Sequence, residues 1–152
     1  DGALLSNGPG DPADNREILP EVQKLFAARL PMMGVCLGHQ LMALASGAKT
    51  EKLPFGHRGA NQPVKDLVTG RVAVTSQNHG YTVRPDSLPA CATLRFVNCN
   101  DGTCEGIVYR SAPAFSVQFH PEACGGPHDT AYLFDDFLTT VHHAESEGSP
   151  CR

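Results

Sequence analysis

One cysteine in this chain lies in a sequence context that could make it a nucleophile. Cys36 is the centre of the segment GVCLG (residues 34–38), between an apolar run and a helical pattern over residues 37–46. Small residues two positions before and after the cysteine allow a sharp strand-to-helix turn that exposes the sulfur. The N-terminal N–H groups and dipole of the following helix would stabilise a thiolate, the reactive form. The alternative is an inert buried cysteine, and such a motif also occurs by chance.

A candidate general base for that nucleophile follows the apolar run 114–119. His120 and Glu122 lie two residues apart at its end, so in extended conformation both side chains leave the same face of the chain. Pro121 cannot continue a sheet ladder and favours an extended His120. A carboxylate beside an imidazole fixes its tautomer and stabilises the imidazolium formed when the ring takes a proton from a thiol. Alone, this motif could be a solvated strand end; together with Cys36 it favours a Cys-His-Glu catalytic site.

A loop rich in glycine and proline, NGPGDP (residues 7–12), follows a short apolar run. Its glycines let backbone N–H groups approach a ligand, and one of them, with the N–H of Leu37, could form an oxyanion hole. The loop can also be an ordinary strand-to-helix connection in which Asp11 or Pro12 starts the helix. The two interpretations are compatible.

In this order and spacing, the segments GPGDP, GVCLGHQ and VQFHPE resemble the class I (triad-type) glutamine amidotransferases. Two further segments, GHRGANQPV (56–64) and TSQNHGY (75–81), are similar to the glutaminase domain of carbamoyl-phosphate synthases, either the bacterial small subunit or the corresponding domain of the fused eukaryotic enzyme. The similarity runs from Asp1 to about Val141. The triad motifs alone do not separate this group from the anthranilate or GMP synthase glutaminases, so the two further segments carry the narrower assignment.

The resemblance implies a reaction and a role for each matched residue. Cys36 would attack the side-chain amide of glutamine to give a γ-glutamyl thioester and ammonia, while His120 would act as base and acid and Glu122 would orient it. Substrate contacts are implied at Gly8, Gly10, Leu37, Gln40, Asn78, Gly80 and Tyr81. Neutral amide and backbone groups can bind an amino acid without leaving an unpaired charge buried in the empty site.

Other polar residues are left out of this site. His39 and His79 each flank a proposed site residue, and a histidine on a helix or tight loop more often serves packing or hydrogen bonding than catalysis. Arg58 either holds a loop or faces a partner. The six cysteines contain no C-x-x-C pair and no His-x-His element accompanies them, so we expect reduced thiols and no metal site.

The resemblance further implies a synthetase partner, a large subunit or fused domain. The partner would use ATP, bicarbonate and magnesium with the delivered ammonia to make carbamoyl phosphate for pyrimidine or arginine synthesis. This chain has no G-x-x-x-x-G-K-[ST] loop, so we expect no cofactor within it. A formal net charge of -4 argues against nucleic-acid or anionic-membrane binding. Since no signal-peptide pattern or apolar run of roughly 20 residues is present, we expect a cytoplasmic protein.

Other functions stay open from the sequence. They are the glutaminase of another amidotransferase (anthranilate or GMP synthase type), a γ-glutamyl hydrolase that acts without a synthetase, and a non-catalytic regulatory module of the same fold. The joint presence of Cys36, His120 and Glu122 argues against the module. The segments QNHGY and GHRGANQP argue against the γ-glutamyl hydrolase.

Hydrophobic periodicity predicts the elements that would position these residues. We expect helices over residues 13–28, 37–46 and 129–142, and strands over residues 2–6, 31–35, 49–53, 71–76, 81–84, 94–98, 105–109 and 114–119. Helices and strands alternate first and short strands follow, which predicts a three-layer α/β fold with an antiparallel excursion. By resemblance this is the flavodoxin-like fold of the class I glutamine amidotransferases, with a mixed, mainly parallel central sheet.

We expect one glutaminase domain over residues 1–143 and a flexible tail or linker over residues 144–152, which are rich in Ser, Glu, Gly and Pro. The chain opens directly on Asp1-Gly2-Ala3, whereas the family that it resembles carries an additional strand and helix before this point. We therefore also expect the domain to lack its first strand and helix.

Overall fold

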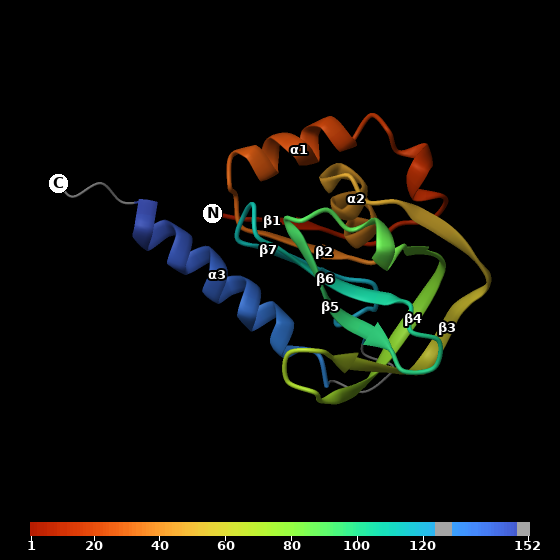
Figure 1. Ribbon diagram of the computed structural model, residues 1–152. Helices are drawn as coiled ribbons and strands as arrows, with labels where there is room; N and C mark the ends of the chain where they lie inside the picture. Colours follow the sequence, from red (N-terminus) through yellow and green to blue (C-terminus); the bar gives the residue numbers. More distant parts are fainter. Residues whose placement is uncertain (124–128, 149–152) are drawn as a thin grey trace.

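In the computed structural model, which describes residues 1–123 and 129–148, a seven-stranded sheet lies between helices on both of its faces (Figure 1). The strand order is β1-β2-β7-β6-β5-β3-β4. Helices α1 (Leu19–Ala27) and α2 (Leu37–Ser46) cover one face, and α3 (Tyr132–Gly148) packs on the other. The three-layer α/β class predicted from the sequence is confirmed.

Three strands form the parallel part of the sheet: β1 (Ala3–Leu5), β2 (Met32–Val35) and β7 (Ala114–Val117). Every residue of β2 and β7 is buried, as expected for parallel strands covered on both faces. Val35 is the register partner of Val117, so the carboxyl ends of β2 and β7 lie side by side. The segments that continue from these two ends carry Cys36 and His120.

The other four strands are antiparallel to their neighbours: β3 (Thr50–Asp66), β4 (Val72–Val83), β5 (Ala92–Asn98) and β6 (Cys104–Tyr109). The antiparallel part is therefore larger than the predicted excursion, and the sheet is mixed but not mainly parallel. The reason is that these strands follow one another without an intervening α-helix, and parallel neighbours need a long crossover connection.

Strands β3 and β4 form a long hairpin, and the segments GHRGANQPV and TSQNHGY lie within β3 and β4, respectively. The sequence predicted only short strands at residues 49–53, 71–76 and 81–84. Register shifts between Lys52 and His57 and between Gly59 and Gln62 interrupt the pairing, which explains why no continuous strand pattern shows in the sequence.

The helix predicted over residues 13–28 is divided in two. A 3-10 turn, η1 (Pro12–Asp14), comes first, and the carboxylate of Asp11 caps it by accepting a hydrogen bond from the N–H of Ala13 at 2.9 Å. Helix α1 starts only at Leu19, because Pro20 lacks an N–H and is tolerated in the first turn of a helix but not in its interior. Helix α2, in contrast, has the predicted bounds.

Helix α3 begins and ends later than the predicted range 129–142. Residues 144–148, which we expected in a tail, continue the helix, and residues 149–152 lie outside the described residues. The division into a domain and a tail otherwise stays a prediction. None of the helices in the described part of the chain combines the length and the apolar character needed to cross a membrane.

Two apolar clusters fill the spaces between the layers, one on each face of the sheet. Successive side chains of β2 point to opposite faces of the sheet, so Met32 packs in the first cluster, with Val22 of α1 and Met42 of α2. Met33 packs in the second cluster, with Leu133 of α3. Both faces of the strand are thus packed, and β2 is held firmly on the two sides just before Cys36.

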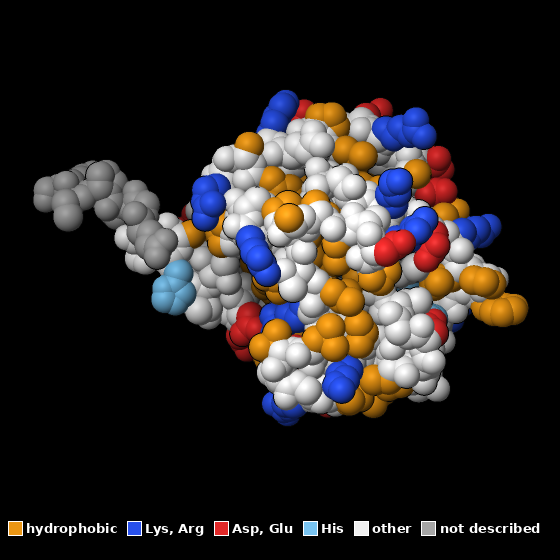
Figure 2. Space-filling model, viewed as in Figure 1, with side chains coloured by type: hydrophobic (Ala, Val, Ile, Leu, Met, Phe, Trp, Pro, Cys, Tyr) orange, Lys and Arg blue, Asp and Glu red, His pale blue; other side chains and the backbone are white. Residues whose placement is uncertain are grey.

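Apolar side chains also reach the surface at the far end of the β3–β4 hairpin. Leu67, Val68, Val72 and Val74 are exposed, and hydrophobic atoms are visible in the lower part of the face shown in Figure 2, where the hairpin lies. The Lys and Arg side chains of the described residues on this face stand apart from one another. That arrangement differs from the clustered positive charge typical of nucleic-acid-binding surfaces.

Candidate active site

Cys36 occupies the turn between β2 and α2 in a strained backbone conformation. Its φ is 52° and its ψ is -103°, and φ values in this range are rare for residues other than glycine. The backbone N–H of Cys36 donates to the carbonyl oxygen of Val117 on β7 at 2.9 Å, and α2 begins at the next residue. Strand pairing on one side and helix on the other maintain the strain, as in a nucleophile elbow.

The two glycines of GVCLG are required by close packing. A Cβ on Gly34 would lie 2.6 Å from Sδ of Met42 and 2.9 Å from the backbone of Gly38. A Cβ on Gly38 would overlap the backbone of Leu5 on β1. Small residues were predicted here to permit the turn; the structure adds that they let β1, β2 and α2 approach one another behind the cysteine.

His120 and Glu122 are paired after the end of β7. Nδ1 of His120 lies 2.8 Å from Oε1 of Glu122, and the backbone N–H of His120 donates to the carbonyl oxygen of Ser76 on β4 at 2.9 Å. Because the carboxylate takes the hydrogen bond of Nδ1, Nε2 is the nitrogen that can exchange a proton with a reacting group. The contact between these two side chains agrees with the sequence; their catalytic roles stay a prediction.

A cavity of about 630 Å³ brings the separate motifs together. Cys36, His120 and Glu122 all line it, and so do two of the predicted substrate contacts, Gly8 and Asn78. Cys36 and His120 both line it because β2 and β7 are parallel neighbours whose carboxyl ends share one edge of the sheet. Ligands of open α/β sheets bind in this position.

Five predicted substrate contacts lie outside the described lining of this cavity: Gly10, Leu37, Gln40, Gly80 and Tyr81. Gln40 is 3% exposed, and its amide donates to the carbonyl oxygen of Tyr81 at 2.8 Å and to Oε1 of Gln118 at 2.9 Å. In this structure Gln40 therefore supports the wall of the site.

The loop that carries Gly8 and Gly10 touches both sides of the site. A Cβ on Gly8 would lie 2.6 Å from Cδ2 of Leu37, so the loop packs against the residue that follows the nucleophile. Desolvation and a hydrogen bond with the carboxylate of Asp11 raise the pKa of Tyr81, which links the same loop to β4. An oxyanion hole formed by this loop and Leu37 would need such proximity.

Burial raises the pKa of the Cys36 thiol to about 11. The backbone N–H of Leu37 hydrogen-bonds the sulfur and acts in the opposite direction, and the negative charges of Glu122 and Glu105 raise the pKa further. The N–H at the helix N-terminus therefore favours the thiolate, as expected, but desolvation is the larger effect and the net shift favours the thiol. Cys36 is held there as a neutral thiol.

This leads to a pH-dependent prediction. Deprotonation of Cys36 creates a charge in a buried place, so its alkylation by iodoacetamide should be slow at pH 8. The alkylation rate should then rise about tenfold per pH unit towards pH 11. The rate of an ordinary thiol, with a pKa of about 8.5, levels off at a lower pH. Mass spectrometry of the Cys36 peptide after short pulses measures the rate, and the exposed Cys99 serves as the control for the reagent. A plateau below pH 9 would instead indicate a stabilised thiolate.

The sequence analysis missed Gln118. This residue is fully buried, accepts a hydrogen bond from Gln40, and its side chain acts to lower the pKa of Cys36. It therefore connects the helix that carries Gln40 to the nucleophile. A polar residue inside the apolar run that ends at Phe119 was the signal that could have identified it.

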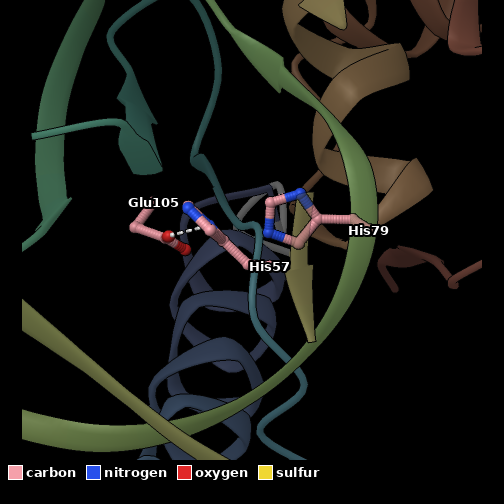
Figure 3. A group of neighbouring side chains, drawn as sticks. All are labelled: His57, His79 and Glu105. Carbon is pink, nitrogen blue, oxygen red and sulfur yellow. Dashed lines mark ion pairs between the residues drawn. The ribbon is translucent and has the colours of Figure 1, made fainter. Parts of the chain in front are cut away.

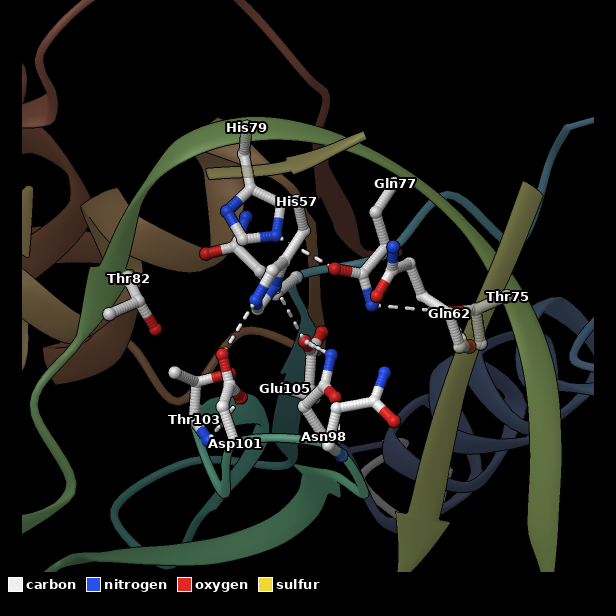
Figure 4. A network of polar contacts seen from close by, with 12 residues as sticks. His57, Gln62, Thr75, Gln77, His79, Thr82, Asn98, Asp101, Thr103 and Glu105 are labelled. Atoms are coloured by element: carbon white, nitrogen blue, oxygen red, sulfur yellow. Dashed lines mark hydrogen bonds and ion pairs between the residues drawn. The ribbon is translucent and has the colours of Figure 1, made fainter. Parts of the chain in front are cut away.

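The sequence analysis also missed a polar network, mostly buried, that joins β3, β4 and β6 (Figure 4). Nε2 of His57 lies 2.8 Å from Oδ2 of Asp101, and Nδ1 lies 3.4 Å from Oε1 of Glu105. The carboxylate of Glu105 raises the pKa of His57 to about 9, whereas burial lowers the pKa of His79 to about 4. The histidines that look isolated along the chain are neighbours in space, because the hairpin register places His57 opposite His79.

The residues left out of the catalytic set have structural contacts, as expected. His39 is fully buried, and its Nδ1 lies 2.8 Å from Oγ of Ser116. Arg58 donates from Nη1 to the carbonyl oxygen of Phe55 at 2.7 Å. Of the two roles considered for Arg58, this contact supports holding the loop.

A cysteine on a strained strand-to-helix turn, with an imidazole and a carboxylate supplied from the neighbouring parallel strand, is typical of α/β proteins built for nucleophilic attack on a carbonyl carbon. The family model of Glutamine amidotransferase class-I matches residues 1–140. The chain belongs to the class-I glutamine amidotransferase family.

Two curated relatives share more than half of their aligned residues with this chain. The chain is 58% identical over 141 residues to the carbamoyl phosphate synthase small chain of Akkermansia muciniphila, which covers 93% of this chain and 38% of that protein. It is 58% identical over 139 residues to the carbamoyl phosphate synthase small chain of Methanopyrus kandleri, covering 91% and 38%. The chain thus spans about two fifths of the length of these relatives.

Solved structures with low sequence identity share the fold. A protein from Thermoplasma acidophilum, described as part of a GMP synthase, matches with a TM-score of 0.79 at 24% identity, over 96% of this chain and 75% of that one. A glutamine amidotransferase from Thermotoga maritima matches with a TM-score of 0.66 at 22% identity, over 95% and 70%.

Proposed function

We propose that this chain is the glutaminase part of a carbamoyl-phosphate synthase. It hydrolyses the side-chain amide of glutamine through a thioester at Cys36 and supplies ammonia to a synthetase subunit or domain. The observation that carries this proposal is the cavity lined by both Cys36 and the His120–Glu122 pair. The names of the curated relatives given above support the choice of synthetase.

The chemistry follows from the positions of these three side chains. Sγ of Cys36 attacks the amide carbon of glutamine as its proton passes to Nε2 of His120. The carbon–nitrogen bond breaks when the leaving nitrogen takes that proton, which yields ammonia and the thioester. Water then attacks the thioester, with His120 again accepting the proton, and glutamate and the free thiol are released. Glu122 holds the ring through Nδ1 at each step.

The neutral thiol suits this sequence of steps. Transfer of the proton from Cys36 to His120 produces a thiolate and an imidazolium together, and this pair carries no net charge. A lone thiolate in the same buried site is opposed by desolvation and by the charge of Glu122. The nucleophile is therefore activated when proton transfer and attack occur together, which limits reaction with other electrophiles.

The developing oxyanion would be stabilised by the N–H of Leu37 at the start of α2 and by an N–H of the loop at Gly8. The contact between Gly8 and Leu37 supports this assignment. Loss of one such donor lowers kcat by about 10²–10³-fold in enzymes of this kind. Asn78, which lines the cavity, is proposed to bind the α-amino or α-carboxylate group of glutamine, with Gly10, Gln40, Gly80 and Tyr81 contributing around it.

The ammonia must reach a second active site before it is protonated and lost to solvent. We place ATP, bicarbonate and magnesium in that partner, which forms carbamoyl phosphate for pyrimidine or arginine synthesis. The cytoplasm is the proposed compartment, because the cysteines of the described residues are free thiols, as is usual in a reducing compartment.

A glutamine analogue with an electrophilic carbon in place of the side-chain amide carbon tests the proposed function. We expect it to label Cys36 selectively, as read by mass spectrometry of the modified peptide, and excess glutamine to suppress the labelling. Iodoacetamide, which lacks the amino-acid groups, is the matched control and should prefer the exposed Cys99. Equal labelling of Cys36 and Cys99 by the analogue, or no protection by glutamine, would contradict a glutamine site at Cys36.

Product assays separate the competing functions. Hydrolysis of glutamine in preference to γ-glutamyl peptides is expected, and the reverse preference would identify a γ-glutamyl hydrolase. No turnover with either substrate, alone or with a synthetase partner, would leave a non-catalytic module of this fold.

A further inference from the structure

A group of three chemistry-bearing side chains lies outside the Cys36–His120–Glu122 constellation (Figure 3). His57 of β3 and His79 of β4 are direct register partners, with ring centroids 5.0 Å apart at an interplanar angle of 87°. Glu105 of β6 is fully buried beside them. One possible ligand atom from each of the three lies within 4.8 Å of the others.

The outer contacts of both rings have the pattern of metal-binding histidines. Nε2 of His57 contacts the carboxylate of Asp101 at 2.8 Å, and Nδ1 of His79 contacts the carbonyl oxygen of Tyr81 at 2.8 Å. Histidine ligands in proteins usually donate their other N–H to a carboxylate or to a backbone carbonyl in this way, which fixes the ring and its tautomer. Nδ1 of His57 and Nε2 of His79 are then the nitrogens left for an ion.

Two buried atoms of the group make no hydrogen bond of standard geometry among the described residues: Oε2 of Glu105, and Nδ1 of His57, which lies 3.4 Å from Oε1 of Glu105 in an ion pair. Oε1 also accepts a hydrogen bond from the amide of Asn98 at 3.1 Å. A buried carboxylate oxygen without a partner is costly, and such atoms are rare in folded proteins unless an ion or a water satisfies them. The unpartnered oxygen therefore points to a ligand.

One contact of the group, between Gln77 and His79, brings two hydrogen-bond acceptors face to face (Figure 4). The hydroxyl of Thr75 donates to the carbonyl oxygen of Gln62 at 2.9 Å, so its oxygen must accept from Nε2 of Gln77 at 3.1 Å. That orientation places Oε1 of Gln77 2.9 Å from Nε2 of His79. Since His79 already donates from Nδ1, a neutral ring presents a lone pair to the amide oxygen, and a cation placed between the acceptors would resolve the conflict.

We propose that His57, His79 and Glu105 form a binding site for a divalent first-row transition-metal ion, with Zn²⁺ as the probe. Two imidazole nitrogens and one carboxylate oxygen are a common ligand set for such ions. Ligands at about 2.0–2.1 Å from a tetrahedral centre are about 3.4 Å apart, so separations of up to 4.8 Å must shorten by side-chain rotation. Oε1 of Gln77 or a water would complete the coordination.

The ion would join β3, β4 and β6, and β4 also carries Asn78, which lines the Cys36 cavity. This site goes beyond the proposed glutaminase function and does not depend on it, because its test is metal binding. A failure of one proposal therefore leaves the other standing.

The test begins with the whole chain, reduced and treated with EDTA. Calorimetric titration with Zn²⁺ should show one high-affinity ion per chain. Free Zn²⁺ at about 100 times its Kd should raise Tm by about 5–10 °C. Co²⁺ should give the spectrum of a tetrahedral site without a sulfur-to-metal charge-transfer band, which separates this site from the cysteines.

Substitutions of single residues identify the side chains that bind the ion. Glu105→Gln and His57→Asn should weaken Zn²⁺ binding by at least about 100-fold, and Asp101→Asn, which changes only an outer contact, by about 10–100-fold. His142→Asn, a change of an exposed histidine on α3, and Cys36→Ala should bind as the parent chain does. Circular dichroism of each metal-free variant checks that it is folded.

Three outcomes would overturn the proposal: no saturable Zn²⁺ binding, binding with a sulfur charge-transfer band, or binding unaffected by Glu105→Gln in a folded protein. The first would mean that a proton shared between His57 and Glu105 suffices in place of a metal ion.

Discussion

Replacing Cys36 with alanine is expected to abolish the release of glutamate from glutamine. Without Sγ the thioester cannot form, so kcat should fall by a factor on the order of 10⁵–10⁶, as for the removal of other covalent nucleophiles. A coupled assay for glutamate with the purified chain, or with its synthetase assembly if turnover requires one, measures the loss. The protein should remain folded, because the substitution shortens one side chain and keeps the turn.

Two comparisons make this prediction specific. Cys99→Ser, a change of an exposed thiol, should retain the parent rate. In the assembly with a synthetase, the Cys36→Ala variant should still support carbamoyl phosphate formation from free ammonia, since only the glutamine-dependent supply is lost. Unchanged glutamine hydrolysis in this variant would rule out Cys36 as the nucleophile.

Replacing His120 with asparagine should have the second largest effect. The variant keeps a polar side chain but cannot accept a proton from the thiol or return it to the leaving nitrogen, so kcat should fall by about 10²–10⁴-fold. The KM for glutamine should change little, because His120 is proposed to act on the reacting atoms and not on substrate binding. Steady-state assays over a range of glutamine concentrations separate the two parameters.

The companion variant Glu122→Gln should lose less activity than His120→Asn, because the imidazole is still present and only its orientation and the stabilisation of its charged form are weakened. His142→Asn, on the exposed side of α3, is the matched control for loss of a histidine. Equal activity of His120→Asn and the parent chain would show that another group transfers the proton.

Elements with strong local signals could be predicted from the sequence. Helix α2 has the predicted bounds, and β2 was predicted within a residue of its observed start. Both predictions depend only on neighbouring residues: a short apolar run for the strand, and glycines that mark the turn before the helix. The helix predicted over residues 13–28 was wrong in its first part, because Pro20 can occupy a first turn but not a helix interior.

Strand direction and register could not be read in the same way. The mainly parallel sheet was the wrong expectation because β3 to β6 pair through turns, and the bulges in the β3–β4 hairpin hide its period of two. The register partners His57 and His79 are far apart in the sequence, so nothing local indicates that the two rings meet.

The sequence by itself determined the motifs: a cysteine at a turn that only glycines permit, and a histidine and glutamate spaced to share one face. These features depend on backbone conformation and spacing within a few residues. Only the tertiary structure decided that both motifs line one cavity, that Gln40 supports the wall, that Cys36 is a buried thiol with a raised pKa, and that His57, His79 and Glu105 converge. The burial of a side chain, the electrostatic field around it and the register of its strand all depend on contacts between distant segments. Such contacts exist only once the chain has folded.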